Sequence, residues 1–269
     1  MKKLTAFLLF AASAAFCQEA PPDRVTVPFS DPSRPKTLRV NLINGGITVK
    51  GYEGKDAIVE ARPKGERHHR AERSDGMKRI DLAGTGLVVE ESENILKVGT
   101  RSVNEDMQLT IQVPYNTSLK LSTINGGDIV VDHVAGDVEL QDTNGKITAT
   151  HISGTAVVNA LNGKVLVSFD KISGDKPMSF SSMNGDIDVT LPADVKTKVK
   201  LKSDNGAVYS DFDIQMDASA RKPVVQDNQS GHGRYRVQFD KAMFGLINGG
   251  GAEMQLTTFN GNIYIRKAK

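Results

Sequence analysis

The sequence predicts an all-β protein, a single-chain parallel β-solenoid or β-helix, and two observations support this fold class. The first is a repeated turn signal, because Asn-Gly pairs recur with central spacings of 19, 18, 22 and 21 residues. A period of about 20 residues with one small structural unit per repeat is typical of a solenoid. The pairs begin at Asn44, Asn125, Asn144, Asn162, Asn184, Asn205, Asn248 and Asn260.

The second observation is a set of apolar columns that follow the Asn residues. The third residue after the Asn is β-branched and apolar in most repeats, at Ile47, Ile147, Val165, Ile187, Val208 and Ile263. Ile129 joins this column if Gly127 is an extra, bulge-forming residue. Apolar residues recur two positions further on, at Val49, Val131, Val167, Val189 and Ile265. Alternation with period two predicts strands that bury one face.

Each central interval also contains a second glycine turn near its middle, as at 135–137 and 153–155. One repeat is therefore expected to run strand, turn, strand, turn, and to form one coil. About ten such coils, stacked about 4.8 Å apart, predict a rod about 50 Å long. Stacked Asn amides are expected to hydrogen-bond from coil to coil at the turns. The alternative fold is an antiparallel β-sandwich, because Asn-Gly between apolar runs is also the strongest short hairpin signal.

The chain is expected to begin with a signal peptide at residues 1–17. Two lysines precede an apolar run from Leu4 to Phe16, which is shorter than the roughly 20 residues that span a bilayer. No transmembrane segment is expected, and the protein is predicted to be exported to the periplasm or the extracellular space. Lipoprotein anchoring through Cys17 is the less favoured alternative, because Phe16 is bulky where that signal needs a small residue.

After the signal, residues 18–36 are expected to form an N-terminal linker, and residues 37–267 the solenoid domain. Irregular insertions are expected near 63–79 and 215–233, where the sequence is polar and the period is lost. The formal net charge of +2 gives no field that would recruit nucleic acid. The lone cysteine excludes a disulfide within the chain.

Motifs that carry known chemistry are absent from the sequence. There is no phosphate-binding glycine loop, HExxH, paired-cysteine metal motif or GxSxG. We therefore predict no catalytic residue, no metal site and no cofactor. The candidate binding residues are a basic cluster, Arg67, His68, His69 and Arg70, which could contact phosphate or an acidic polymer.

Acidic residues leave an enzymatic alternative open. Asp186 and Asp188 are two residues apart and would share an outward face, and Asp128 could join them if neighbouring coils brought it close. A glycosidase needs two such carboxylates beside a sugar cleft. The chain has no Trp and only five Tyr, so it offers few aromatic platforms for sugars.

Three stretches carry a resemblance to a known family: LRVNLINGGITVKGYEGKDAIVEAR, LTIQVPYNTSLKLSTINGGDIVVDHVAGDVEL and the recurrent NG-x-I pattern. They resemble the bacterial putative-adhesin family of β-solenoid domains, which is related to head-GIN domains and has no known function. The resemblance runs from about Leu38 to Ile265. It implies a β-solenoid and supplies no catalytic residues.

The function hypothesis is a secreted, non-enzymatic, adhesin-like or cell-envelope interaction module that presents a rigid repetitive β face. Its expected partner is a cell-surface polymer or an envelope protein, and its oligomeric state stays open. Two alternatives remain, a polysaccharide-active enzyme on the same scaffold and a self-assembling structural protein.

Overall fold

The structure is a computed structural model that describes residues 22–64, 85–101, 106–173, 176–217, 223–228, 234–239 and 242–269. Secondary structure in these ranges consists of β-strands and turns. Eighteen strands form one large sheet, and β16 and β17 form a separate antiparallel pair. The strands are β1 (Asp23–Val27), β2 (Lys36–Tyr52), β3 (Ala57–Pro63), β4 (Leu87–Ser92), β5 (Ile95–Thr100), β6 (Met107–Pro114), β7 (Thr117–Val134), β8 (Asp137–Asp142), β9 (Ile147–Ala160), β10 (Val165–Ile172), β11 (Met178–Asn184), β12 (Ile187–Leu191), β13 (Thr197–Asn205), β14 (Val208–Ser210), β15 (Gln215–Met216), β16 (Pro223–Asn228), β17 (Arg234–Phe239), β18 (Met243–Ile247), β19 (Ala252–Asn260) and β20 (Ile263–Lys267).

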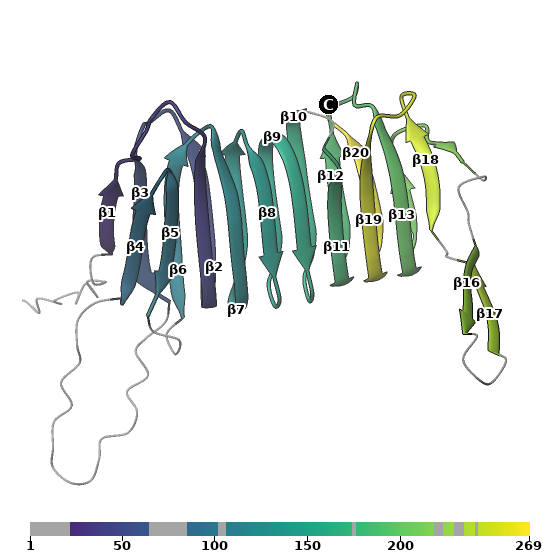
Figure 1. Ribbon diagram of the computed structural model, residues 1–269, viewed down its shortest axis with the longest axis horizontal. Helices are drawn as coiled ribbons and strands as arrows, with labels where there is room; N and C mark the ends of the chain where they lie inside the picture. Colours follow the sequence, from purple (N-terminus) through teal and green to yellow (C-terminus); the bar gives the residue numbers. More distant parts are fainter. Residues whose placement is uncertain are drawn as a thin grey trace, which may run out of the picture.

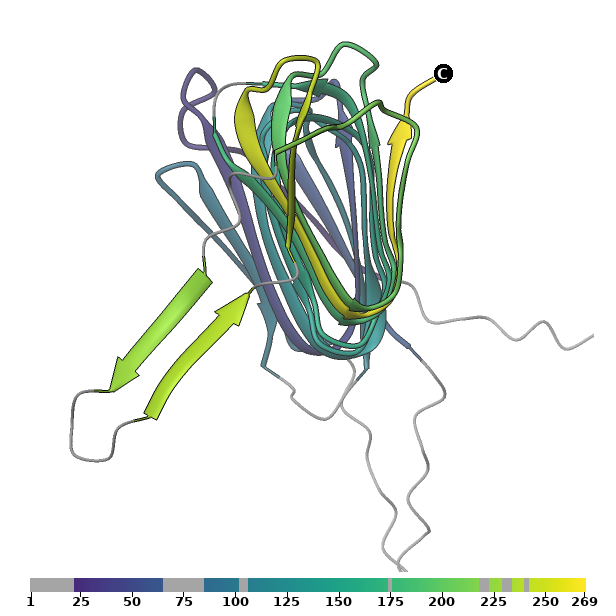
Figure 2. The same cartoon turned by 90° about the vertical axis from the view of Figure 1, so that its right-hand side faces the viewer.

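A coil that contains a periodic Asn-Gly pair has two arms that meet at this turn. β7 shows the pattern, because one arm precedes Asn125 and the other follows it within a single continuous strand. Seen end-on, the stacked coils close into a narrow bend at one edge, while the arms run up from it as two facing layers (Figure 2). We call the closed side the Asn-Gly edge and the other side the opposite edge.

The central strands pair in parallel and in register, which confirms the β-solenoid. Ile47 pairs with Ile129, Ile129 with Ile147, and Val165 with both Ile147 and Ile187. A register shift between Gly45 and Ile47 confirms the bulge expected at Gly127. Six residues of this column are at most 1% exposed and form the core between the arms, namely Ile47, Ile129, Ile147, Val165, Ile187 and Ile263. Val208 is only partly buried.

Antiparallel pairing is confined, among the described strands, to the two ends of the stack and to the β16–β17 pair. β3 pairs in this way with β1 and β6, β4 with β5, and β18 with β13 and β15. These strands follow turns that reverse the chain direction at the ends of the solenoid. The antiparallel sandwich is therefore not the fold of this chain.

The order of the coils differs from the sequence-based expectation. The stack runs 95–114, 36–52, 117–134, 137–154, 155–172, 178–191, 252–267 and 197–210. The first Asn-Gly coil and the last one are thus each inserted between two other coils, and Figure 1 shows β19 between β11 and β13. Each coil offers backbone N–H and C=O groups and apolar columns in the same parallel register, so stack neighbours need not be sequence neighbours.

The number of coils is also smaller than predicted. Eight coils lie in the described part of the chain, where about ten were expected, and seven steps of about 4.8 Å give a stack about 34 Å long. The 80 residues between Asn44 and Asn125 hold one coil, the outer strands β3 and β4, and residues 65–84, which lie outside the described residues.

Asn248 is the exception among the Asn-Gly pairs. Asn248, Gly249 and Gly250 all have positive φ, and they form the turn from β18 to β19. The side-chain amide of Asn248 donates to the carbonyls of Ala193 and Val195. This explains why the 12-residue gap to Asn260 does not fit the period.

Two of the sequence predictions concern the ends of the domain. β1 lies inside the range 18–36 that was expected to be a linker, and it pairs with β3. The expected signal peptide, including Cys17, lies outside the described residues, as does most of the first insertion. In the described ranges, no helix is long and apolar enough to cross a membrane.

Candidate functional site

The Asn-Gly edge carries a continuous ladder of side-chain amides. Nδ2 of each Asn donates to Oδ1 of the Asn in the adjacent coil, over distances of 2.8–3.0 Å. The ladder follows the stack order, through Asn125, Asn144, Asn162, Asn184, Asn260 and Asn205. All six residues are exposed. The ladder bonds use one N–H of each donating amide and leave an acceptor lone pair on each oxygen, and Asn144 donates its second N–H to the carbonyl of Ile124 at 3.2 Å.

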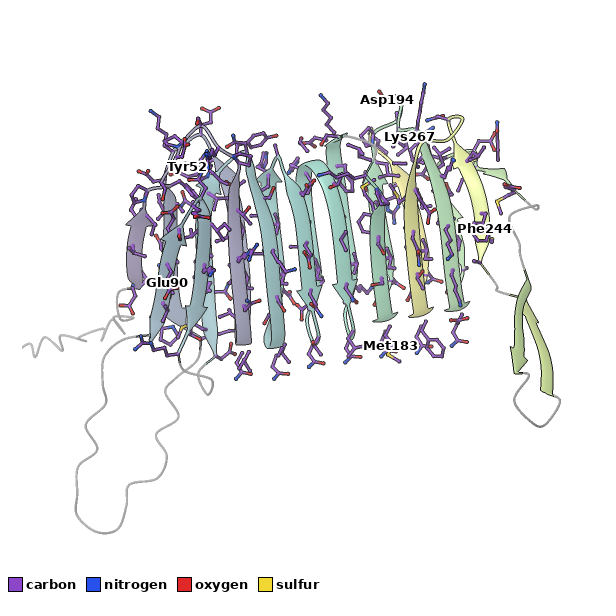
Figure 3. The ribbon with its side chains drawn as sticks, viewed as in Figure 1. Tyr52, Glu90, Met183, Asp194, Phe244 and Lys267 are labelled. Atoms are coloured by element: carbon purple, nitrogen blue, oxygen red, sulfur yellow. The ribbon has the colours of Figure 1, made fainter. Side chains whose placement is uncertain are left out.

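A row of exposed apolar side chains runs beside this ladder, because the residue before each Asn points out of the bend. Five of these residues are large and apolar and are 42–49% exposed: Ile43, Ile124, Leu161, Met183 and Phe259. Figure 3 shows Met183 below the lower ends of the strands, at the edge opposite to Tyr52. Exposed apolar side chains that gather in one place mark interaction sites more often than scattered ones do.

A polar hollow adjoins the ladder near one end. It has a volume of about 420 Å³, and its lining includes Lys64, Gln108, Asp128 and Asn144. The ammonium of Lys64 donates to the carbonyl of Gly126 at 2.9 Å. This lining offers both hydrogen-bond donors and acceptors close to the amide row.

A buried carboxyl interrupts a column of hydroxyl groups just inside the edge. In four coils the residue two positions before the Asn donates its side-chain hydroxyl to a glycine carbonyl of the adjacent coil. These residues are Thr123, Ser182, Thr258 and Ser203. Asp142 occupies this position in its own coil, is 2% exposed, and its Oδ2 has no hydrogen-bond partner. Burial raises the pKa of Asp142 to about 6, and the neighbouring charge of Asp128 adds to the increase.

The acidic residues considered for catalysis are held by other groups. Asp186 accepts the Asn262 N–H and pairs with Lys164 at 3.1 Å, and these contacts hold its pKa below the usual value. Asp188 pairs with Arg266 at 2.8 Å. A general acid of a glycosidase needs a raised pKa, so this environment does not favour catalysis.

Asp128 does not join that pair. It lies three coils away from Asp186 in the stack, about 14 Å at the usual strand spacing. Its carboxylate accepts the backbone N–H of Lys146 at 2.9 Å.

At the opposite edge, two histidines from neighbouring coils meet one carboxylate. Nδ1 of His133 lies 2.8 Å from Oδ2 of Asp132, and Nδ1 of His151 lies 2.9 Å from Oδ1 of the same residue. The two rings stack with their centroids 4.2 Å apart. The hydroxyl of Thr150 also donates to Asp132 at 2.9 Å.

These contacts set the protonation of the cluster. Partial burial alone would raise the pKa of Asp132, but the hydrogen bonds from His151, His133 and Thr150 outweigh it and lower that pKa to about 2. The hydrogen bond to Asp132 raises the pKa of His151. The carboxylate is therefore an anion at any physiological pH.

The basic candidates Arg67, His68, His69 and Arg70 lie outside the described residues. Sequence reasoning missed the cluster of Asp132, His133 and His151. His133 and His151 are 18 residues apart, the same interval as Asn144 and Asn162, so the coil period could have placed them together.

One family model matches part of the chain. Residues 133–241, less than half of the chain, match the family model described as Toastrack DUF4097. For this segment the match confirms the resemblance to the adhesin-like family of β-solenoid domains, whose function is not known. No curated protein matches the sequence.

Two crystal structures align with most of this chain. A putative cell adhesion protein from Clostridium sporogenes ATCC 15579 aligns with a TM-score of 0.43 and 12% identity, covering 92% of this chain and 100% of that one. A putative adhesin from Bacteroides fragilis NCTC 9343 aligns with a TM-score of 0.36 and 9% identity, covering 92% of this chain and 97% of that one.

Proposed function

We propose that the protein is an exported, non-enzymatic binding module that attaches to a repetitive polysaccharide of the cell envelope along its Asn-Gly edge. The observation that carries the proposal is the combination of one exposed apolar row with one unbroken amide ladder on the same edge. The basic cluster at Arg67–Arg70 is not needed for this mode of binding.

Repetition favours a polymer as the ligand. The edge presents an amide and, in most coils, an apolar side chain at steps of about 4.8 Å. Sugar units present both hydroxyl groups and apolar C–H faces, so one unit can use both rows. Many weak contacts made along one chain add up, because the second and later contacts are intramolecular.

The rigidity of the edge also favours binding. Every Asn in the ladder is already held by its neighbour, so little side-chain freedom remains to be lost when a ligand binds. A ligand therefore does not have to order the surface that it binds.

The test is co-sedimentation of the mature chain, without residues 1–17, with isolated cell-wall and surface-polysaccharide fractions. Both the protein in the pellet and the sugar released into solution are measured. We expect retention by one fraction without release of sugar. Retention by none of them, or release of sugar by the wild type, would contradict the proposal.

Paired variants locate the binding surface. Met183→Ser with Phe259→Ser removes two apolar side chains of the edge that are 49% and 47% exposed. Val157→Ser with Leu166→Ser is the matched control, because these residues are 47% and 40% exposed and lie outside the row. We expect the edge variant to lose at least about tenfold in retention, which corresponds to about 1.4 kcal/mol, and the control to bind like the wild type. Equal losses in both variants would place binding elsewhere.

A further inference from the structure

The opposite edge carries a cluster that the proposed polymer binding does not use. We propose that Asp132, His133 and His151 form a binding site for a divalent late first-row transition metal ion, such as Zn²⁺ or Cu²⁺. Two neighbouring coils supply the residues, since β7 holds Asp132 and His133 and β9 holds His151.

The donor atoms are already close to a metal-binding arrangement. One carboxylate oxygen and the two imidazole nitrogens lie within 4.8 Å of one another. The N···O distances are 2.8 and 2.9 Å. Two ligands at about 2.1 Å from a tetrahedral ion are about 3.4 Å apart, so each of these pairs has to open by about 0.5 Å, a movement that rotation of exposed side chains can supply.

The backbone at both histidines adopts an uncommon conformation that aims the rings at one place. His133 and His151 have φ of 55° and 54°, in the left-handed region. Residues other than glycine cost free energy there, and histidine is among the few types that are enriched in this region. Asp132 pairs in register with Thr150, so the two histidines occupy equivalent positions in adjacent coils. Strained backbone that recurs at matched positions of one cluster is typical of a functional site.

The donor set selects the class of ion. Two imidazole nitrogens with one carboxylate suit Zn²⁺, Cu²⁺, Ni²⁺ and Co²⁺, whereas Ca²⁺ and Mg²⁺ prefer oxygen ligands. Two carboxylates give the site negative charge. One is Asp132, and the other is Asp170, which acts electrostatically on His151.

The cluster is accessible to an ion, which would take the place of the protons between the histidine Nδ1 atoms and the Asp132 carboxylate. The histidine side chains are 51% and 50% exposed, and Asp132 is 30% exposed. When the ion binds, each neutral ring carries its proton on Nε2 and offers the Nδ1 lone pair. The carboxylate then binds the ion in place of the two N–H groups. Three protein ligands leave at least one position for water or for a ligand from outside.

The test is calorimetric titration of the untagged, EDTA-treated and dialysed mature chain with ZnCl₂, CuCl₂ and, separately, MgCl₂. We expect one equivalent of Zn²⁺ or Cu²⁺ to bind and no heat of binding for Mg²⁺. His133→Asn and His151→Asn are the informative variants, because asparagine tolerates positive φ and lacks the imidazole. Each should weaken binding at least about tenfold, and the double variant should abolish it.

The control variants replace the three histidines that lie outside the cluster. His232→Asn and the double variant His68→Asn with His69→Asn should keep the full stoichiometry; these three residues lie outside the described residues. Far-UV circular dichroism and the unfolding midpoint in EDTA report whether each variant is folded.

A measurement on the wild type alone makes the test independent of variant folding. The electron paramagnetic resonance spectrum of the Cu²⁺ complex should show coupling to two imidazole nitrogens. A wild type that binds no ion, a spectrum without nitrogen coupling, or a folded double variant of His133 and His151 that still binds one equivalent would each overturn the proposal. These outcomes leave the polymer proposal untouched, because no variant of the metal site lies on the Asn-Gly edge.

Discussion

Replacing Asp142 by serine should stabilise the protein at neutral pH and remove part of its pH dependence. The other coils show why, since serine and threonine stand at this position and donate to a glycine carbonyl of the adjacent coil. A carboxylate cannot donate. The hydroxyl donor of the other coils is therefore missing here, and Oδ2 of Asp142 is buried without a hydrogen-bond partner.

The size of the effect follows from the pKa of Asp142, which is raised from 3.8 to about 6. A carboxyl group whose pKa is raised in the folded state contributes its full stabilisation to folding only at pH values below its pKa in the unfolded chain. That stability is lost as the pH rises through the folded pKa, here between about pH 4 and pH 6. The shift of about two units corresponds to about 3 kcal/mol at pH 7 and above.

Asp142→Ser removes this loss. It also replaces the bond from the Asn144 N–H to Oδ1 of Asp142, at 3.0 Å, by a bond from the serine hydroxyl to a glycine carbonyl, and the two hydrogen bonds, each worth about 1 kcal/mol, offset each other. We expect a gain of about 3 kcal/mol at pH 7.5, or a rise of roughly 6 to 12 °C in the thermal midpoint for a chain of this size. At pH 4 most of the advantage disappears, because the wild-type carboxyl is protonated in the folded state.

The assay is urea unfolding followed by far-UV circular dichroism from pH 4 to pH 8, since the chain has no tryptophan to report by fluorescence. Asp142→Asn should lose the same pH dependence, because it cannot ionise. Asp194→Asn, at an exposed turn, should behave like the wild type. A gap between Asp142→Ser and the wild type that stays constant with pH would refute the reasoning.

Three further predictions concern the ladder, its glycines and the last coil. Asn184→Ala removes two amide hydrogen bonds of the ladder and should cost about 2 kcal/mol of stability. Asn205→Ala, at the end of the ladder, removes one and should cost about half as much. Equal urea midpoints of the two variants would contradict this prediction. Gly163→Ala would place its Cβ 1.9 Å from a carbonyl oxygen of the adjacent coil and should cost at least about 3 kcal/mol of stability. In Gly249→Ala the Cβ meets no atom, and this variant should cost only about 1 kcal/mol, because of the positive φ. A reversed order of thermal midpoints would contradict the prediction. Deletion of residues 252–269 removes four fully buried apolar side chains, whose burial is worth roughly 6 to 12 kcal/mol, and should yield aggregated protein. Deletion of Lys269 alone should not, and a soluble, β-rich truncated chain would contradict the prediction.

The sequence allowed the coil and its register to be predicted but not the order of the coils. Ile129 could be aligned with Ile147 because alternation and the turn signal act within one coil. The place of the coil at 252–267 depends on which strand edge is open when that coil forms. Since every coil offers an equivalent edge, the pattern contains no information that distinguishes one neighbour from another.

The same distinction applies to the sites. The amide ladder could be predicted because each Asn has the same place in its repeat. The histidine pair needs three further facts: the coil length at one position, the left-handed backbone of His133 and His151, and the orientation of Asp132 between them. None of these follows from residue type. The acids Asp186 and Asp188 could be placed on one face. Lys164, the partner of Asp186, belongs to the preceding coil of the sequence, whereas the partner of Asp188 depends on the stack order, since Arg266 belongs to the inserted coil.

The inserted coils have a consequence for the proposed binding edge. In a simple solenoid each coil contacts only its neighbours, so the outermost coil can detach first without disturbing the rest. Here the coil at 197–210 is outermost, yet the chain returns from it to form the coil at 252–267 beneath it. At the other end the coil at 36–52 is likewise enclosed, between 95–114 and 117–134. Loss of an end coil therefore pulls on a coil inside the stack. This arrangement opposes fraying and keeps the amide ladder continuous to its last rung, which multivalent attachment to a polymer requires.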